Sequence, residues 1–207
     1  MRKPRLRSTG IKLLASAGLV GAAAAVAGLG TFGTFTSTTS ASQTVAAGTV
    51  SIGLGTAGTA TNRLTVGASN LVPGDTIQRQ VQLSNNGNQA LAGISLTTTA
   101  SPSSLLDTDA TNGLQLAVQS CPTAWTEAGT APAYTYTCSG TATTVLSSRP
   151  VIGSNLTLPG LNSLRANASD NLVVTLTFPT TAGNTFQGLS DTINFSFTGT
   201  QRAAQND

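Results

Sequence analysis

The chain has 207 residues, of which only 8% are charged, and it contains no histidine. Its formal net charge of +3 comes from a basic N-terminus, since five of its ten Lys and Arg residues lie within the first twelve positions. The remainder holds five Arg against seven acidic residues, a net charge of −2, and this balance excludes an electrostatic nucleic-acid binder.

The N-terminus has the pattern of a secretory signal peptide. Basic residues precede an apolar run at 11–30, and we place the whole signal peptide at 1–34. The candidate cleavage residues are Gly33, Thr34 and Phe35, with Ala41 as the alternative. A retained membrane anchor is the competing interpretation, but the run is mostly Ala and Gly, which are weakly hydrophobic. We therefore expect no membrane-bound segment after processing.

About 170 residues remain after the signal peptide, which is enough for one domain with a sizeable core. We expect an N-terminal arm at 35–48, a β-domain at 49–200 and a polar C-terminal tail at 201–207. No stretch after Gly30 shows helical periodicity. Alternating apolar and polar residues predict strands at 49–54, 63–66, 76–84, 91–99, 114–120, 134–138, 143–146, 156–158, 172–178 and 193–198. Short strands with one apolar face predict two antiparallel sheets packed face to face.

The clearest strand, 76–84, lies between two turns rich in Pro, Gly, Asp and Asn, the residues that turns favour. The turn residues are Pro73, Gly74 and Asp75 before the strand, and Asn85, Asn86 and Gly87 after it. This turn–strand–turn unit is the most distinctive stretch of the chain.

Cys121 and Cys138 are the only cysteines, and export to an oxidising compartment predicts that they form a disulfide. A redox or metal-binding pair is the alternative, but the Cys-x-x-Cys spacing and any His partner are missing. Trp125, Tyr134 and Tyr136 lie between the cysteines. They either pack around the bridge or form an aromatic platform for a sugar.

Catalytic patterns are missing from the sequence. Without His, a Ser-His-Asp triad, a zincin site and a His general base are excluded. The carboxylates lie in or beside predicted turns, and the acidic stretch 107–113 fits a turn better than a calcium loop. We therefore expect no enzymatic activity, no metal and no cofactor.

Three blocks of the sequence resemble the TasA and camelysin family of secreted bacterial matrix proteins. They are 31–35 with 45–50, then 70–75 through 85–88, and finally 186–188 leading into 193–197 and 200–201. The resemblance implies a jelly-roll domain, removal of the leader by a dedicated signal peptidase, and assembly into fibres of the biofilm matrix. Camelysin has also been described as a protease, which nothing in this His-free chain supports.

The same resemblance implies strand donation, in which the mature N-terminal arm completes a sheet in the next subunit. The candidate residues are Phe35, Val45 and Val50. The arm carries neither charge nor proline, as a strand that adds to an open sheet edge requires. A disordered tether is the other interpretation of this segment.

Two functions follow as hypotheses. The first is a secreted subunit of a non-covalent homopolymer, with a minor surface protein as an anchoring or nucleating partner. Covalent cross-linking through lysine is excluded, because no Lys follows the signal peptide. The alternative is a monomeric module that uses the region of Trp125 and Tyr134 to bind a glycan or wall polymer.

Overall fold

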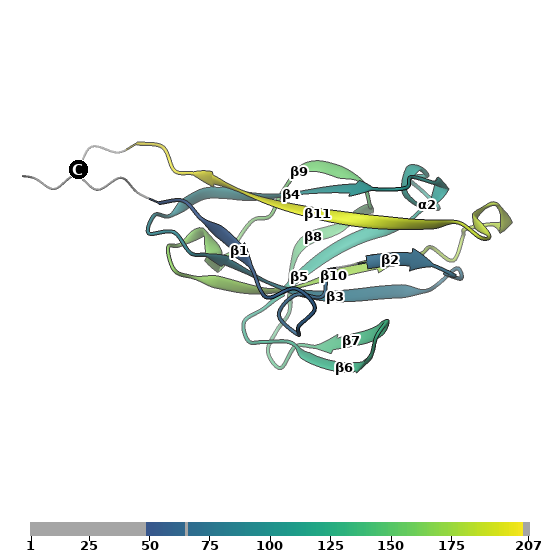
Figure 1. Ribbon diagram of the computed structural model, residues 1–207, viewed down its shortest axis with the longest axis horizontal. Helices are drawn as coiled ribbons and strands as arrows, with labels where there is room; N and C mark the ends of the chain where they lie inside the picture. The colour runs from purple at the N-terminus through teal and green to yellow at the C-terminus, as the bar shows by residue number, and fades with distance from the viewer. Residues whose placement is uncertain (1–48, 65, 205–207) are drawn as a thin grey trace, which may run out of the picture. The chain divides into compact units, whose positions relative to one another are not determined.

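The computed structural model describes residues 49–64 and 66–204, which form two packed antiparallel β-sheets and a separate hairpin (Figure 1). The five-stranded sheet has the order β1 (Ile52–Leu54), β3 (Thr76–Asn85), β10 (Ser169–Thr177), β5 (Gln115–Cys121) and β8 (Thr143–Pro150). The four-stranded sheet has the order β2 (Val66–Ser69), β11 (Ser190–Gln201), β4 (Leu91–Ala100) and β9 (Gly153–Thr157). The expected all-β sandwich is confirmed.

The connections between the strands identify the sandwich as a jelly roll. The chain changes sheets at each step from β2 to β5 and again from β8 to β11. Eight strands are thereby arranged as β2-β11-β4-β9 facing β3-β10-β5-β8, the double-sheet arrangement of that fold. The short β1 is an addition at the edge beside β3.

The core consists of the inward rows of both sheets. Leu172 lies opposite Val81, and Val174 lies opposite Val118, so that aliphatic side chains continue across three strands of the five-stranded sheet. They pack against the inward row of the other sheet in one buried cluster. The alternation of apolar and polar residues along each strand therefore fixes which face is buried.

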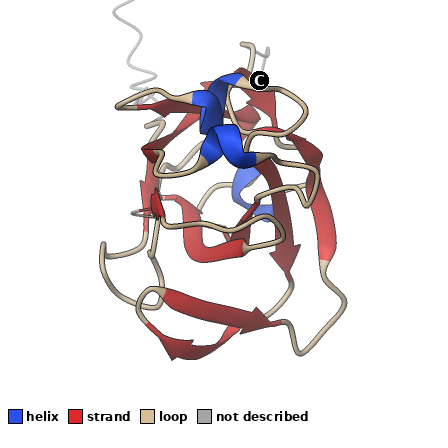
Figure 2. Ribbon diagram, turned by 90° about the vertical axis from the view of Figure 1, so that its right-hand side faces the viewer, coloured by secondary structure: helices blue, strands red, loops and turns tan. Residues whose placement is uncertain are grey.

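A disulfide-linked excursion between β5 and β8 covers the outer face of the five-stranded sheet. It contains the hairpin of β6 (Thr126–Thr130) and β7 (Ala133–Thr137), which forms its own layer in Figure 2. Cys121 at the end of β5 joins Cys138 after β7 with an S–S distance of 1.98 Å. Val173, on the outer face of β10, is 1% exposed because it packs in a second hydrophobic cluster with Cys121, Trp125 and Tyr136.

Several boundaries differ from the sequence prediction. The strand expected at 63–66 lies at Val66–Ser69 instead, because residues 62 and 63 bond to β3 in the other sheet before the chain crosses over. The hairpin strand β6 and three short helices were not expected: α2 (Leu105–Thr108), η1 (Asn162–Leu164) and η2 (Asn184–Phe186). None of the helices in the described residues is long and apolar enough to cross a membrane.

The helix α2 forms because its first turn is capped. It is too short to show the 3.6-residue period by which longer helices are predicted. Ser104 accepts a hydrogen bond from Leu106 N–H, and Asp107 accepts one from Ser104 N–H, a capping box. Asp107 faces Asp191 of β11, whose two carboxylate oxygens have no hydrogen-bond partner in the described part of the chain. Burial raises the pKa of Asp191, the side chain of Ser104 partly opposes this effect, and the neighbouring Asp107 carboxyl raises the pKa further.

Loss of the disulfide should lower stability. In the chain-entropy model a cross-link between residues 17 apart contributes about 3 kcal/mol. We expect the double substitution Cys121→Ser with Cys138→Ser to lower the free energy of unfolding by about that amount in urea denaturation. Reductant should reproduce the loss in the wild type and leave the double variant unchanged. Equal stability of oxidised and reduced wild type would contradict the prediction.

Asp191 should destabilise the domain at neutral pH. Its raised pKa means that the folded state binds the proton more tightly than the unfolded state, so stability is lost as pH rises through the folded pKa. We expect Asp191→Asn to raise the free energy of unfolding at pH 7, because it removes a buried negative charge beside Asp107 and leaves a neutral side chain of the same shape. The gain should vanish below the pKa of an unfolded aspartate, about 3.9.

Asp109→Asn is the matched control, and its effect on the free energy of unfolding should have the opposite sign. Backbone N–H groups of Asn112 and Thr111 lower the pKa of Asp109, so its charged form stabilises the fold at pH 7. That variant should be less stable than wild type at pH 7 and equal to it in acid. A pH-independent effect of Asp191→Asn would show that its charge is not the cause.

Candidate functional site

The turn after β3 holds the first described residues of the chain, which we call the arm clamp (residues 49–51 with 85–88). Thr49 N–H donates to Asn88 Oδ1 at 2.7 Å, and Asn88 N–H donates to Thr49 O at 3.1 Å. Asn86 N–H donates to Ser51 O at 2.8 Å. The predicted arm at 35–48 therefore joins the domain at a fixed point.

Gly87 makes the clamp sterically feasible. A Cβ at this position would lie 2.2 Å from Thr49 O and 3.0 Å from Ser51 N, well inside van der Waals contact. Asn85 shapes the same turn, because its side chain accepts from Gly87 N–H at 2.9 Å and donates to Gln89 O at 3.0 Å. The Asn-Asn-Gly-Asn sequence is thus suited to receiving a second segment of backbone.

The turn before β3 lies at the opposite end of that strand and does not contact the clamp. Asp75 Oδ2 accepts from Val72 N–H at 2.9 Å, and Gly74 adopts a positive φ of 101°. Gly74 N–H and Asp75 O both bond to Phe178, just past β10. Pro73, Gly74 and Asp75 therefore close the far end of the sandwich.

Most of β11 lacks a partner on one side, and we call this stretch the β11 open edge (residues 194–201). β2 pairs only with Ser190–Ile193, and no other described residue bonds to the backbone of β11 beyond that point on the side away from β4. Ser101 N–H donates to Thr192 O, so the backbone N–H and C=O groups of Thr192 face β4. Alternation along an antiparallel strand then directs the N–H and C=O groups of Phe195 and Phe197 toward the open side.

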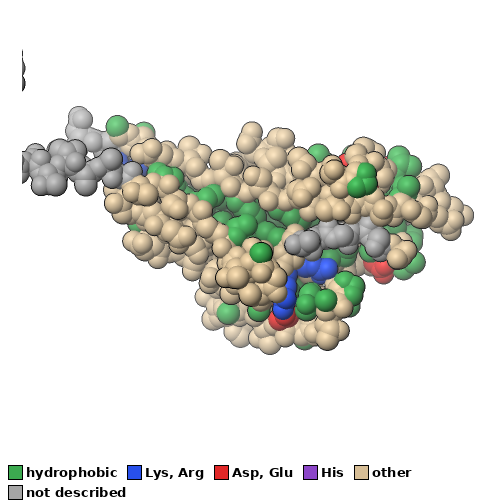
Figure 3. All heavy atoms as spheres, in the orientation of Figure 1, with side chains coloured by type: hydrophobic (Ala, Val, Ile, Leu, Met, Phe, Trp, Pro, Cys, Tyr) green, Lys and Arg blue, Asp and Glu red, His purple; other side chains and the backbone are tan. Residues whose placement is uncertain are grey.

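The seam below the open edge is hydrophobic and partly empty. Phe195 and Phe197 are only half-buried, although they belong to the inward row of β11. A cavity of about 250 Å³ lies beside them, lined by Leu54, Ala57, Asn62, Leu64 and residues 192–195. Figure 3 shows hydrophobic side chains at the surface between the two sheets on this face. Both the backbone and the side chains here are suited to an additional strand.

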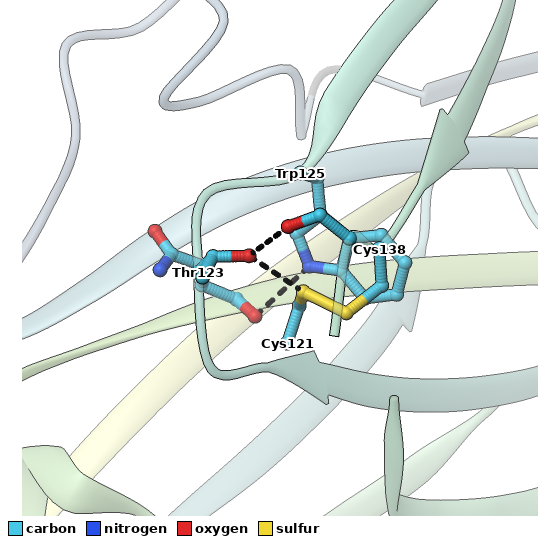
Figure 4. The surroundings of a disulfide bond; sticks show 6 residues. Cys121, Thr123, Trp125 and Cys138 are labelled. Atoms are coloured by element: carbon cyan, nitrogen blue, oxygen red, sulfur yellow. Dashed lines mark hydrogen bonds between the residues drawn. A yellow bond between two sulfur atoms is a disulfide. The ribbon is translucent and has the colours of Figure 1, made fainter. Parts of the chain in front are cut away.

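The aromatic residues near the disulfide are structural for the most part. Trp125 is 9% exposed, lies beside the Cys121–Cys138 bridge (Figure 4), and donates from Nε1 to Asn171 O at 3.0 Å. Tyr136 is 8% exposed, and burial raises its pKa to about 12. The alternative interpretation of an exposed sugar platform is therefore wrong for Trp125 and Tyr136, and only Tyr134 of the three is accessible.

The described residues do not offer the ligands of a catalytic metal ion. They contain no cluster of three or more His, Cys, Asp or Glu side chains, both cysteines are in the disulfide, and the sequence has no His. Asp109 accepts from the N–H groups of Thr111 and Asn112, as a turn residue does. These donors do not fit the catalytic centre of a metallopeptidase.

The cleavage and donation candidates Gly33, Thr34, Phe35, Ala41 and Val45 lie outside the described residues. Val50, the remaining candidate, is 37% exposed and lies between two clamped residues. Sequence reasoning missed the role of Asn88, whose partner Thr49 is 39 residues away. It also missed Arg79, although a charged residue within the inward row of Ile77, Val81 and Leu83 was a visible signal.

In a comparison with protein families, residues 10–121 match the family model described as camelysin metallo-endopeptidase. The matched region is more than half of the chain and includes both turns around β3, of which the second belongs to the arm clamp. A search of curated proteins finds no match.

Gly87→Ala should release the arm clamp. The added methyl group cannot coexist with Thr49 O, so the hydrogen bonds of residues 49–51 must break or lengthen. We expect a loss of about 2 kcal/mol in the free energy of unfolding and faster hydrogen exchange at the Asn86 and Asn88 amides. Gly93→Ala is the control, because nothing lies within 4 Å of the Cβ added there. Equal effects of the two substitutions would contradict the role of Gly87.

Proposed function

The chain belongs to the camelysin metallo-endopeptidase family, and from this premise we propose that it is a secreted structural subunit that assembles by N-terminal strand donation. The observation that supports this function best is the β11 open edge, with the half-buried Phe195 and Phe197 and a cavity beneath it. The arm of one subunit would pair with the open edge of the next.

The geometry of the open edge suits a donated strand. Unpaired N–H and C=O groups of an exposed edge bind an extended segment through backbone hydrogen bonds, and pockets beneath the edge select its alternate side chains. The half-buried Phe195 and Phe197 would lose their remaining exposure on such pairing. Because each residue of an antiparallel strand spans about 3.4 Å, an arm of 14 residues is long enough to cover the edge.

The composition and attachment of the arm also support the proposal. Residues 35–48 carry no charge and no proline, and Phe35 and Val45 provide apolar side chains for the seam. The clamp at Thr49 fixes where the arm leaves its own domain. Head-to-tail donation does not close on itself, so it produces filaments without any covalent bond.

The remaining roles in this proposal concern processing and attachment. A signal peptidase would remove residues 1–34 on export, and a minor surface protein would anchor or nucleate the fibre at the cell surface. The subunit would act without catalysis, since its donor residues do not fit the metal centre that the family description implies.

Filament formation should require the arm. We expect protein that starts at Phe35 to form filaments visible by electron microscopy, whereas protein that starts at Thr49 keeps the clamp and stays monomeric in sedimentation. Ser196→Lys, on the exposed face of the open edge, should inhibit assembly, because charged side chains on edge strands oppose pairing.

Thr99→Lys is the matched control, since Thr99 lies opposite Asn194 on the same exposed face but on the internal strand β4. It should assemble like wild type. Monomeric protein from Phe35, with the β11 amides protected from exchange by its own arm, would overturn the proposal.

A further inference from the structure

A second cavity lies between the chain after β1 and the tip of the β6–β7 hairpin, and we call it the hairpin cleft. Its volume is about 350 Å³, and its lining consists of Gly58, Asn62, Arg63, Arg79, Ala131, Pro132 and Tyr134. It shares only Asn62 with the cavity beside β11. Figure 3 shows basic side chains next to an acidic one on this face, close to the hairpin.

The charge of one of its two arginines, Arg63, is compensated by an ion pair. Arg63 makes a forked pair with Glu127, with NH2 to Oε1 at 2.8 Å and Nε to Oε2 at 3.1 Å, and its NH1 donates to Gly58 O. Tyr136 Oη also donates to Glu127 Oε2 at 2.9 Å. The carboxylate of Glu127 is therefore neutralised by Arg63, from the segment after β1.

The other arginine has no counter-charge. Arg79 is only 6% exposed, and its guanidinium makes a single hydrogen bond to the described residues, from Nη1 to Gln78 O at 2.7 Å. Six of the seven acidic residues are described, and the only ion pair among them is that of Arg63 with Glu127. Burial lowers the pKa of Arg79, as expected for a desolvated cation. An unpaired buried charge is costly, and such a cost is common at binding sites.

The walls of the cleft indicate which chemical groups, besides an anion, a ligand would need. Ala131, Pro132 and the Tyr134 ring form an apolar side, and the two guanidinium carbons lie 4.7 and 5.6 Å from the centre of that ring. A few fixed polar groups within an apolar wall are typical of small-molecule sites. The cleft has room for a ring as well as a carboxylate, and it supplies only one uncompensated positive charge.

We propose that the hairpin cleft binds a carboxylated sugar of the hexuronate class. The carboxylate pairs with the free N–H groups of Arg79, and the sugar ring lies against Pro132 and Tyr134. Arginine suits this role, since its planar fork matches a carboxylate. The site is separate from the β11 open edge, so the proposal does not depend on strand donation.

The test is a titration of the domain starting at Thr49, followed by NMR, with D-glucuronate and D-galacturonate as probes. We expect at least one of them to shift the Arg79 Nε–Hε signal saturably. D-Glucose and acetate should each bind about tenfold more weakly, since each lacks one half of the recognised chemistry. Equal binding of glucose, equal binding of acetate, or no shift by either uronate would overturn the proposal.

Substitutions separate a binding role from a structural one. Arg79→Gln lacks the Nε–Hε signal, so its binding is followed at the backbone amides of Arg63 and Tyr134, which line the cleft. The uronate shifts of these amides should disappear without a lower thermal unfolding midpoint, because the substitution removes an unpaired charge. Tyr134→Ala, on the accessible hairpin, should weaken binding without disturbing the core, and it gives an answer even if Arg79→Gln does not fold. Arg165→Gln, at an exposed site outside the cleft, is the control for net charge. Uronate binding that survives in both cleft variants would overturn the proposal.

Discussion

Backbone N–H and C=O groups need hydrogen-bond partners, and the arrangement of this domain depends on that constraint. A jelly roll has four sheet edges, and here two of them on one side are filled by the very short strands β1 and β2. β1 covers only the C-terminal end of β3, and β2 covers only the N-terminal end of β11. The long remainder of β11 is left with a hydrophobic seam beneath it. Natural sheets seldom leave such an edge exposed, which is why an added strand explains it well.

The five-stranded sheet, in contrast, has its apolar outer surface covered by the chain itself. Its outer face is covered by an excursion that is closed by a disulfide and anchored by Trp125 to the backbone of β10. Val173 is buried there as deeply as residues of the main core. The chain thus protects one apolar surface with its own residues, whereas the seam at β11 lacks such a cover among the described residues. The same excursion places Ala131, Pro132 and Tyr134 beside Arg79 in the hairpin cleft without providing a counter-charge.

The family description and the side chains of this protein differ in an informative way. A metallo-endopeptidase needs ligands that hold a metal and a group that activates water. This chain has no His, and its cysteines are used in a structural bridge. The region that matches the family, residues 10–121, includes the turn–strand–turn unit around β3. In this domain that unit closes one end of the sandwich and holds residues 49–51 at the other.

The sequence alone determined the class of the fold, because period-two alternation sets which face of each strand is buried, as in β3 and β10. The disulfide followed as well, since only two cysteines were present to pair. Tertiary structure decided what alternation cannot encode. The partner of Gly87 is 38 positions away, the length of pairing along β11 depends on where β2 ends, and the burial of Trp125 depends on β10. Each is a contact between segments distant in sequence, and local patterns contain no information about which distant segment arrives.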